Sequence, residues 1–116
     1  MMIRQFEIWL ANLNPQKGTE AGKKRPVLVV QTNFLNKIAH PSTIICPITS
    51  NVVEGFEVLR VHLPKGTGNM DRASDILIEQ VRSIDNKRFI EKIGNLPHNL
   101  HEAISENIKI VFDLNI

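Results

Sequence analysis

The stretch TEAGKKRPVLVVQT, residues 19–32, decides how the rest of the chain can fold. Its first half is rich in glycine and charge, which is typical of a loop. Its second half, residues 27–30, is an unbroken β-branched and aliphatic run, which predicts a strand buried on both faces. Arg25 stands where the halves meet, and Pro26 favours an extended backbone for it. The sequence therefore predicts a guanidinium group fixed at the edge of a rigid strand.

Glu20 gives this segment two interpretations. Arginine presents a planar fork of donors that suits phosphate, and a glutamate can act as a general base when its surroundings tune it. In the first interpretation, Glu20 and Arg25 belong to one active site. In the second, they form an ordinary ion pair on the surface above the start of the strand. This segment alone does not decide between the two.

Length and composition limit the class of protein. With 116 residues, of which 42 % are hydrophobic, the chain is expected to form one domain, residues 1–116, around its own core. No apolar run reaches the length of a membrane span, the first residues are too charged for a signal peptide, and Cys46 is the single cysteine. We therefore expect a cytoplasmic protein without membrane association or disulfides. The net charge of +2 is compatible with nucleic-acid binding but does not establish it.

The pattern of apolar residues predicts an α+β fold that is mainly β. Strands are expected at residues 7–13, 25–32, 43–48, 57–63, 74–83 and 90–96, and helical segments at 33–40, 85–89 and 97–114. Asn33 is expected to cap the first helix, and Asn99 with Glu102 resembles a capping box. Pro47 is expected at a sheet edge or a bulge. Short strands followed by a terminal helix suggest an antiparallel, barrel-like sheet with helices at its ends.

Three polar loops interrupt this sheet, around Glu20, around residues 49–51 and around residues 66–72. Loops at one rim of a small barrel converge, so their side chains can share one site. The chain has no Ser-His-Asp order, HExxH motif, phosphate-binding glycine loop or dense carboxylate cluster. Metal-free and cofactor-free acid–base chemistry remains. RNA suits such an enzyme because its 2′-hydroxyl supplies the nucleophile.

Three sequence blocks resemble, in order, the signature blocks of the MazF/PemK/Kid family, the toxins of toxin–antitoxin pairs. They are EIWLANLNPQKGTEAGKKRPVLVVQ (residues 7–31), IICPITSN (44–51) and ILIEQVRSID (76–85). The similarity runs from about Phe6 to the terminal helix. It implies an SH3-like antiparallel β-barrel of the CcdB/Kid/MazF type, with short helices and a C-terminal helix.

The same resemblance implies an activity and partners. These expectations are a homodimer and a sequence-selective, metal-independent endoribonuclease that cuts single-stranded RNA, leaving 2′,3′-cyclic phosphate and 5′-hydroxyl ends. It also implies a cognate antitoxin with an acidic tail that binds the RNA groove. Two alternatives remain: a non-enzymatic toxin of the same fold that inhibits a protein such as DNA gyrase, and an RNA-binding module without turnover.

The resemblance also assigns roles to single residues. Arg25 matches the catalytic arginine of the G-x-x-R-P motif, and Thr49 matches the catalytic threonine after the buried strand. Glu20 matches a loop glutamate and is the candidate base. The expected RNA-binding residues are Gln80, Ser50, Asn51, Lys23 and Lys24. The two lysines are equally well explained as a solubilising pair.

Two positions depart from the family pattern. Glu79 stands where the family commonly has aspartate, and a longer carboxylate there is expected to reshape the RNA groove. Phe6 stands where the family often has glycine, and we expect it to affect packing. Base recognition is expected in the loops at residues 51–56 and 64–72.

The remaining chemically interesting side chains receive structural interpretations. Trp9 and Cys46 lie in apolar strands and are expected in the core. The other side chains are expected to be solvated or on the surface: His40, His62, His98, His101, Lys65, Arg72 and Lys87.

Overall fold

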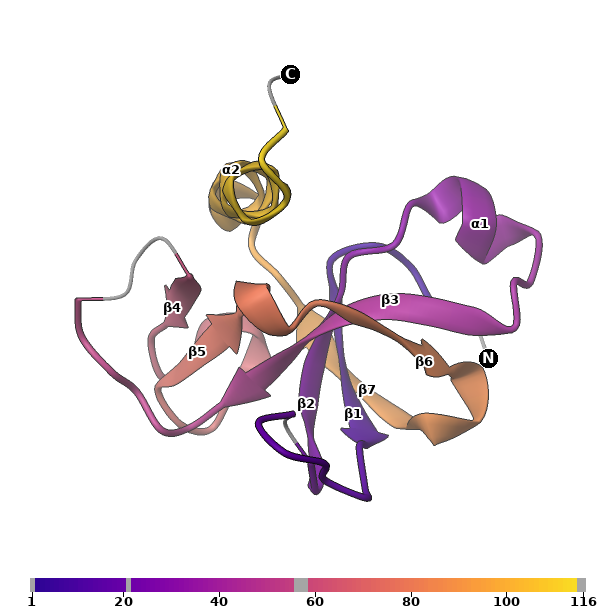
Figure 1. The fold of residues 1–116 in the computed structure, drawn as a ribbon, viewed down its shortest axis with the longest axis horizontal. Helices are drawn as coiled ribbons and strands as arrows, with labels where there is room; N and C mark the ends of the chain where they lie inside the picture. Colours follow the sequence, from indigo (N-terminus) through magenta and orange to yellow (C-terminus); the bar gives the residue numbers. More distant parts are fainter. Residues whose placement is uncertain (1, 21, 56–58, 115–116) are drawn as a thin grey trace.

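An antiparallel sheet and a C-terminal helix make up most of the chain (Figure 1). The computed structural model describes residues 2–20, 22–55 and 59–114. The strands are β1 (Glu7–Asn12), β2 (Lys24–Val29), β3 (Ser42–Thr49), β4 (Arg60–Leu63), β5 (Ser74–Leu77), β6 (Arg82–Asp85) and β7 (Phe89–Asn95). The helices are α1 (Asn33–Lys37) and α2 (His101–Phe112), with 3-10 turns η1 (Thr67–Asn69), η2 (Ile78–Gln80), η3 (Asn86–Arg88) and η4 (His98–Leu100). The α+β prediction is confirmed.

The sheet curves like a barrel but is not closed by hydrogen-bonded strands. Its order is β4-β5-β3-β2-β1-β7, with β6 on β3, so β4 and β7 are the end strands of the described sheet. Instead of pairing with β4, β7 packs against η1, where Asn69 Nδ2 donates to Ile93 O at 3.1 Å. The approach requires glycine, because a Cβ on Gly94 would lie 2.3 Å from Gly68 O. The turn η1 therefore packs against β7 where a closed barrel would have hydrogen bonds between β7 and β4.

The sheet buries apolar side chains on both of its faces. Along β2, Leu28 belongs to one core cluster, whereas Val27 and Val29 belong to another. This alternation follows from the two-residue period of a strand and confirms the prediction of a strand buried on both faces. The first cluster is covered by α2 through the fully buried Ile104. The second contains Trp9, whose ring meets Phe89 edge-on, so Trp9 is in the core as expected.

Pro47 does not lie at a sheet edge, because β3 has partners on both sides. It pairs with Val27 on the β2 side. On the other side of β3, residues 42–45 pair with β6, and residues 48 and 49 pair with β5. The edge prediction is wrong, but Pro47 lies at the interruption between two partner strands, where a missing backbone N–H is tolerated.

Both helix starts differ from the sequence prediction. Thr32, not Asn33, caps α1, and its hydroxyl accepts the Phe34 N–H at 3.3 Å. The helix α2 is preceded by the turn η4, and no side-chain hydrogen bond caps its start at the N-cap residue Leu100. The capping box at Asn99 is therefore absent.

Two predicted strands have different bounds in the structure. The segment predicted as a strand at 74–83 is split by η2 into β5 and β6, so its ends pair with different parts of β3. The strand predicted at 57–63 starts at Arg60 as β4, and residues 57 and 58 lie outside the described residues. In the described part of the chain, no helix is long and apolar enough to cross a membrane.

Candidate active site

Arg25 lies near the start of β2 and is oriented by its own hairpin. The β1–β2 ladder places it opposite Ala11, and Leu13 N–H donates to Lys23 O at 2.8 Å. The Arg25 Nε–H donates to Gly22 O at 2.7 Å. Among the described residues, neither terminal nitrogen of the guanidinium has a hydrogen-bond partner. Burial lowers the pKa of Arg25, although an arginine remains charged at neutral pH. The guanidinium is thus fixed through its Nε, and its two terminal nitrogens are available to a ligand.

Gly22 makes this orientation possible. It is buried against the loop, and a Cβ at this position would lie 2.4 Å from Gln16 Cβ. It would also lie 2.9 Å from the backbone atom Gln16 Cα, so a larger residue would displace the backbone. The carbonyl that holds Arg25 therefore depends on a residue without a side chain.

Thr49 lies at the end of β3, across from Arg25. The β2–β3 register pairs Val27 with Pro47, and its continuation places Arg25 opposite Thr49. Directly opposite residues on antiparallel strands present their side chains to the same face. The Thr49 Oγ1 accepts the Asn51 N–H at 3.1 Å. Because a hydroxyl has one donor and two acceptor positions, its proton remains available to a ligand.

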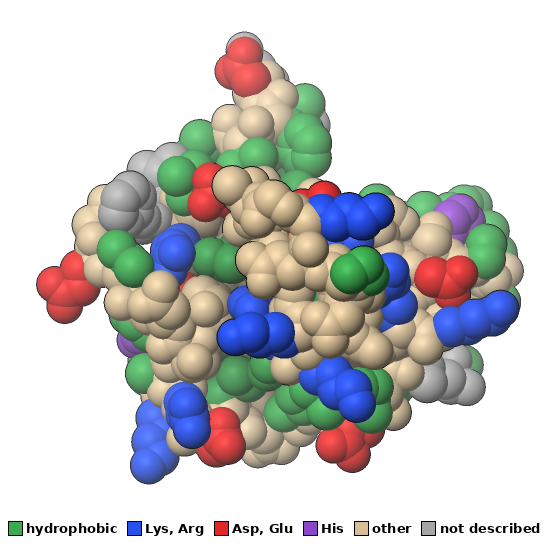
Figure 2. Space-filling model, turned by 60° about the horizontal axis from the view of Figure 1, so that its bottom comes forward, with side chains coloured by type: hydrophobic (Ala, Val, Ile, Leu, Met, Phe, Trp, Pro, Cys, Tyr) green, Lys and Arg blue, Asp and Glu red, His purple; other side chains and the backbone are tan. Residues whose placement is uncertain are grey.

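Arg25 and Thr49 line the same cleft, which has a volume of about 490 Å³. We call it the Arg25 cleft. It is lined by Lys23, Lys24, Arg25, Pro26, Ile48, Thr49, Ser50, Asn51, Met70, Asp71, Arg72 and Ser74. Four of these side chains are basic and Asp71 is acidic. Figure 2 shows Lys and Arg side chains spread over the face that includes the bottom of Figure 1. The cleft is therefore suited to an anion.

Glu20 and Gln80 lie outside the lining of this cleft. Glu20 is half exposed and pairs with Arg82 at 3.2 Å, not with Arg25. Gln80 Nε2 donates to Thr19 O at 3.3 Å, which ties η2 to the same loop. The alternative of a Glu20–Arg25 surface pair is therefore wrong. Of the eight predicted site residues, the structure gathers Lys23, Lys24, Arg25, Thr49, Ser50 and Asn51 around the cleft.

Residues 4–112 match the family described as "PemK-like, MazF-like toxin of type II toxin-antitoxin system". This match covers nearly the whole chain. The chain belongs to this toxin family.

Solved structures of MazF proteins share the fold. MazF from Deinococcus radiodurans (Form-I) is 24% identical with a TM-score of 0.82, over 97% of this chain and 98% of that one. The Mycobacterium tuberculosis toxin MazF-mt6 is 22% identical with a TM-score of 0.79, over 95% and 99%. A mycobacterial endoribonuclease in complex with its cognate antitoxin is 10% identical with a TM-score of 0.76, over 99% and 97%.

Phe6, a departure from the toxin family's pattern, has a backbone reason to be unusual. Its φ is 68°, in the left-handed region that favours glycine. The ring compensates by stacking on His101, with centroids 3.9 Å apart, and the Phe6 carbonyl accepts Leu96 N–H. Phe6 therefore acts in packing, while Glu79, the other departure, is exposed on η2.

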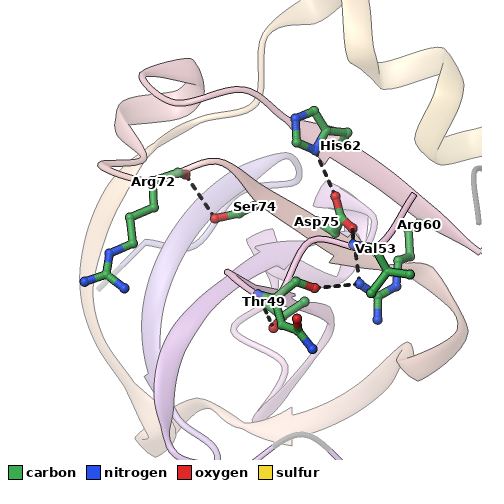
Figure 3. Close-up of polar contacts among 8 residues, drawn as sticks. Thr49, Val53, Arg60, His62, Arg72, Ser74 and Asp75 are labelled. Atoms are coloured by element: carbon green, nitrogen blue, oxygen red, sulfur yellow. Dashed lines mark hydrogen bonds and ion pairs between the residues drawn. The ribbon is translucent and has the colours of Figure 1, made fainter. Parts of the chain in front are cut away.

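The sequence interpretation missed two cleft residues near the start of β5, one before it and one at its first position. Arg72 was expected to be simple surface charge, yet it lines the Arg25 cleft. Ser74 lines it too, and its hydroxyl donates to Arg72 O at 3.1 Å. Figure 3 shows the Arg72 side chain extending away from this bond. The signal that could have found them was the loop at residues 66–72, which was predicted to meet the other loops.

The sequence interpretation also missed a buried carboxylate beside the cleft. Asp75 is 2 % exposed, and Oδ1 contacts His62 Nδ1 at 2.9 Å, while Oδ2 accepts from Arg60 Nη1 at 3.1 Å and from Val53 N–H at 3.2 Å (Figure 3). Burial alone favours the neutral acid, but the hydrogen bonds from His62, Val53 and Arg60 outweigh it and lower the pKa of Asp75. The signal was an aspartate inside the apolar run SDILI, opposite a strand with two basic residues.

Of the four histidines expected to be solvated, His62 and His98 are exposed, whereas His40 and His101 are partly buried. His62 pairs with Asp75. His40 Nδ1 lies 2.9 Å from Ser42 O, and His101 Nε2 lies 3.0 Å from Leu96 O. His98 packs edge-on against His101, with centroids 5.0 Å apart.

Cys46 is not among the residues that line the cleft. Cys46 is buried, and burial raises the pKa of its thiol to about 12, so it behaves as a small apolar residue. Over the described ranges, no group of three or more His, Cys, Asp or Glu side chains is arranged to hold a metal ion.

Proposed function

We propose that this toxin is an endoribonuclease that cuts single-stranded RNA in the Arg25 cleft by attack of the 2′-hydroxyl, without a metal or cofactor. The observation that carries the proposal is that Arg25 of β2 and Thr49 of β3 line one basic cleft, each with an available donor. Support also comes from the solved mycobacterial endoribonuclease with the same fold.

In the proposed reaction, the 2′-oxygen attacks the adjacent phosphorus as it loses its proton to a base. The bond from phosphorus to the 5′-oxygen breaks, and that oxygen leaves with a proton, so the products are a 2′,3′-cyclic phosphate and a 5′-hydroxyl. Negative charge grows on the non-bridging phosphoryl oxygens. Both terminal nitrogens of Arg25 and the Thr49 hydroxyl proton bind these oxygens. Because they are held before the substrate arrives, they stabilise the transition state without reorganisation.

Two carboxylates compete for the role of base. Glu20 is the candidate from the family pattern, but it pairs with Arg82 outside the cleft, so this role requires the loop to close over bound RNA. Asp71 is the one carboxylate among the described residues that line the cleft. Glu20→Gln and Asp71→Asn separate the two, since replacing the base should slow cleavage strongly and replacing the other carboxylate should not.

The direct experiment is to incubate the purified protein with an RNA that has single-stranded loops, in excess EDTA, and to map the ends. We expect cuts that leave cyclic phosphate and 5′-hydroxyl ends, and about a thousandfold slower cutting with Arg25→Ala. RNA bound but not cut would identify an RNA-binding module instead. Absence of both, together with inhibition of DNA gyrase, would identify the non-enzymatic toxin.

The partners proposed for this chain are a second copy of itself and an antitoxin with an acidic tail. Large apolar side chains remain exposed at the end of α2, where Ile110 and Phe112 are each 55% exposed. Exposed apolar side chains of this size suit a protein interface, and light scattering tests the homodimer. The acidic tail is proposed to occupy the basic Arg25 cleft, so that tail and RNA exclude one another. Titration of the antitoxin into an RNA complex of Thr49→Val tests this, and a ternary complex with unchanged RNA affinity would contradict it.

A further inference from the structure

A row of polar side chains extends from the Arg25 cleft across the sheet. Thr49 of β3 pairs with Asp75 of β5, and Asp75 pairs with His62 of β4. Cross-strand partners share a face, and adjacent strands lie about 4.8 Å apart, so His62 is about two strand spacings, roughly 10 Å, from Thr49. Arg60 lies two residues before His62 and therefore shares its face. Arg60 and His62 therefore lie on the same face of the sheet as Thr49, close to the proposed site of RNA cleavage.

This row borders a second hollow, of about 610 Å³, which we call the Asp75 pocket. It is lined by Val52, Val53, Glu54, Gly55, Arg60, His62 and Asp75. The Asp75 carboxylate is buried between His62, Arg60 and the Val53 N–H, so its charge is compensated. Its role is to orient the Arg60 and His62 side chains and to hold the loop that forms the pocket wall.

Arg60 and His62 retain donors for a ligand. The Nη1 of Arg60 donates to Asp75 and to Asn51 O at 2.9 Å, which uses both of its protons. Within the described ranges, the Nε and Nη2 of Arg60 and the Nε2 of His62 have no partner. The His62 side chain is 50% exposed and that of Arg60 20%. Val52 and Val53 add apolar surface, being 39% and 38% exposed.

A hydrogen-bonded chain connects this pocket to the Arg25 cleft. Arg60 donates to the carbonyl of Asn51, and the N–H of the same Asn51 donates to the hydroxyl of Thr49 (Figure 3). The residue that fixes the proposed catalytic hydroxyl is thus held from the pocket side. A ligand that fills both hollows at once would follow this segment from one to the other.

We propose that the Asp75 pocket binds one unstacked nucleotide of the RNA substrate, next to the phosphate that is cut. This inference rests on the proposed function. Single-stranded RNA is recognised through splayed bases that pack on histidine, arginine or apolar side chains and bond at their edges. The base packs against Val52, Val53 and the His62 imidazole, and Arg60 binds its phosphate or base edge. Asp75 is a positioning residue, because it acts through Arg60 and His62.

The test measures binding with an RNA made non-cleavable by a 2′-deoxy substitution at the cut site. His62→Gln and Arg60→Gln are compared with a control, Lys87→Gln. Lys87 is also a basic side chain, but it lies in η3, between β6 and β7 and away from the pocket. We expect about a tenfold loss of RNA affinity for His62→Gln, the size typical of one lost base contact, and no loss for Lys87→Gln. If Arg60→Gln fails to fold, Arg60→Lys keeps the ion pair with Asp75 but loses the planar fork.

A second arm identifies the nucleotide. Abasic residues are placed in turn on each side of the cut site, and each RNA is bound to the native protein and to His62→Gln. At one position, removal of the base should weaken native binding but not weaken His62→Gln further, because the two changes remove the same contact. An acidic peptide whose binding depends on His62 while RNA binding does not would overturn the proposal.

The outcomes separate this inference from the function beneath it. If the native protein cuts RNA but folded Arg60 and His62 variants bind as well as Lys87→Gln, the pocket does not bind RNA and the nuclease assignment stands. If the native protein neither binds nor cuts RNA, the function fails and this inference fails with it.

Discussion

The Arg25 cleft and the Asp75 pocket are neighbours that place basic side chains in opposite ways. In the cleft, Arg25 is held by a backbone carbonyl and forms no ion pair with a carboxylate among the residues that the structure describes. In the pocket, Arg60 and His62 share a buried carboxylate. A guanidinium without a carboxylate partner can stabilise negative charge that develops on a ligand. A guanidinium paired with a carboxylate contributes little net charge and acts mainly through the geometry of its hydrogen bonds. The difference indicates chemistry in the cleft and recognition in the pocket.

The largest effect should come from Arg25. Replacing it with alanine removes the fork that binds the phosphoryl oxygens, and we expect cleavage to slow by about a thousandfold. Arg25→Lys should recover part of this loss, because it keeps the charge but not the bidentate geometry. Single-turnover rates at saturating RNA measure the effect, and thermal melting checks the fold. A folded Arg25→Ala protein with near-native rate would remove the difference between the two hollows.

Thr49 should rank next. Thr49→Val keeps the shape of the side chain but removes the hydroxyl, so we expect a loss of about a hundredfold in rate. Thr49→Ser keeps the donor and should stay close to the native enzyme. If both variants are equally slow, the methyl group and not the hydroxyl is what matters at this position.

Asp75 should affect stability more than the chemical step. Asp75→Asn leaves the partly buried guanidinium of Arg60 without its counter-charge, and we expect the free energy of unfolding to fall by about 1–3 kcal/mol. Urea denaturation at pH 7 measures it. An unchanged stability would mean that the buried cluster is not what holds the pocket together.

Acid should weaken the fold through the same cluster. The folded-state pKa of Asp75 lies below its ordinary value, as does that of Glu7, whose hydrogen bonds from Lys92 and Trp9 outweigh burial. Between the ordinary and the folded pKa the unfolded chain binds protons that the folded chain does not, so stability falls as pH drops below about 4. Asp75→Asn should flatten this acid dependence, and melting temperatures from pH 5 to 2.5 show whether it does.

Lys23 and Lys24 should have the smallest effects. Both are exposed at the rim of the Arg25 cleft, so their attraction to RNA is screened by salt. Each glutamine substitution should reduce the slope of log affinity against log salt by about 0.7 if the lysine contacts a phosphate. An unchanged slope would favour the interpretation of these lysines as a solubilising pair.

Much of the fold could be predicted because it depends on local patterns. The run at residues 27–30 predicted a strand buried on both faces, and the side chains of β2 do enter both core clusters. Bounds that depend on distant partners could not be predicted. Pro47 tolerates a central strand because two different strands share that side of β3, and nothing near Pro47 in the sequence shows this.

The site divides in the same way. The juxtaposition of Arg25 with residues 49–51 follows from strands and loops that the motifs locate. The Asp75 cluster could not be predicted with equal ease, because Asp75 and His62 looked ordinary until the β4–β5 register placed them opposite each other. The ion pair of Glu20 could not be predicted either. Its sequence neighbour Arg25 was the partner that the sequence suggested, but Glu20 pairs with Arg82, which is distant in sequence.

The most direct test of the account is cleavage of one RNA in two versions, in excess EDTA. The versions differ only in the 2′-hydroxyl of the nucleotide at the cut, which is present in one and replaced by hydrogen in the other. The account predicts that the first is cut and the second is bound with similar affinity but stays intact, because the nucleophile is missing. Cleavage of the deoxy version at the same bond, or cleavage of the first that requires added magnesium, would contradict it.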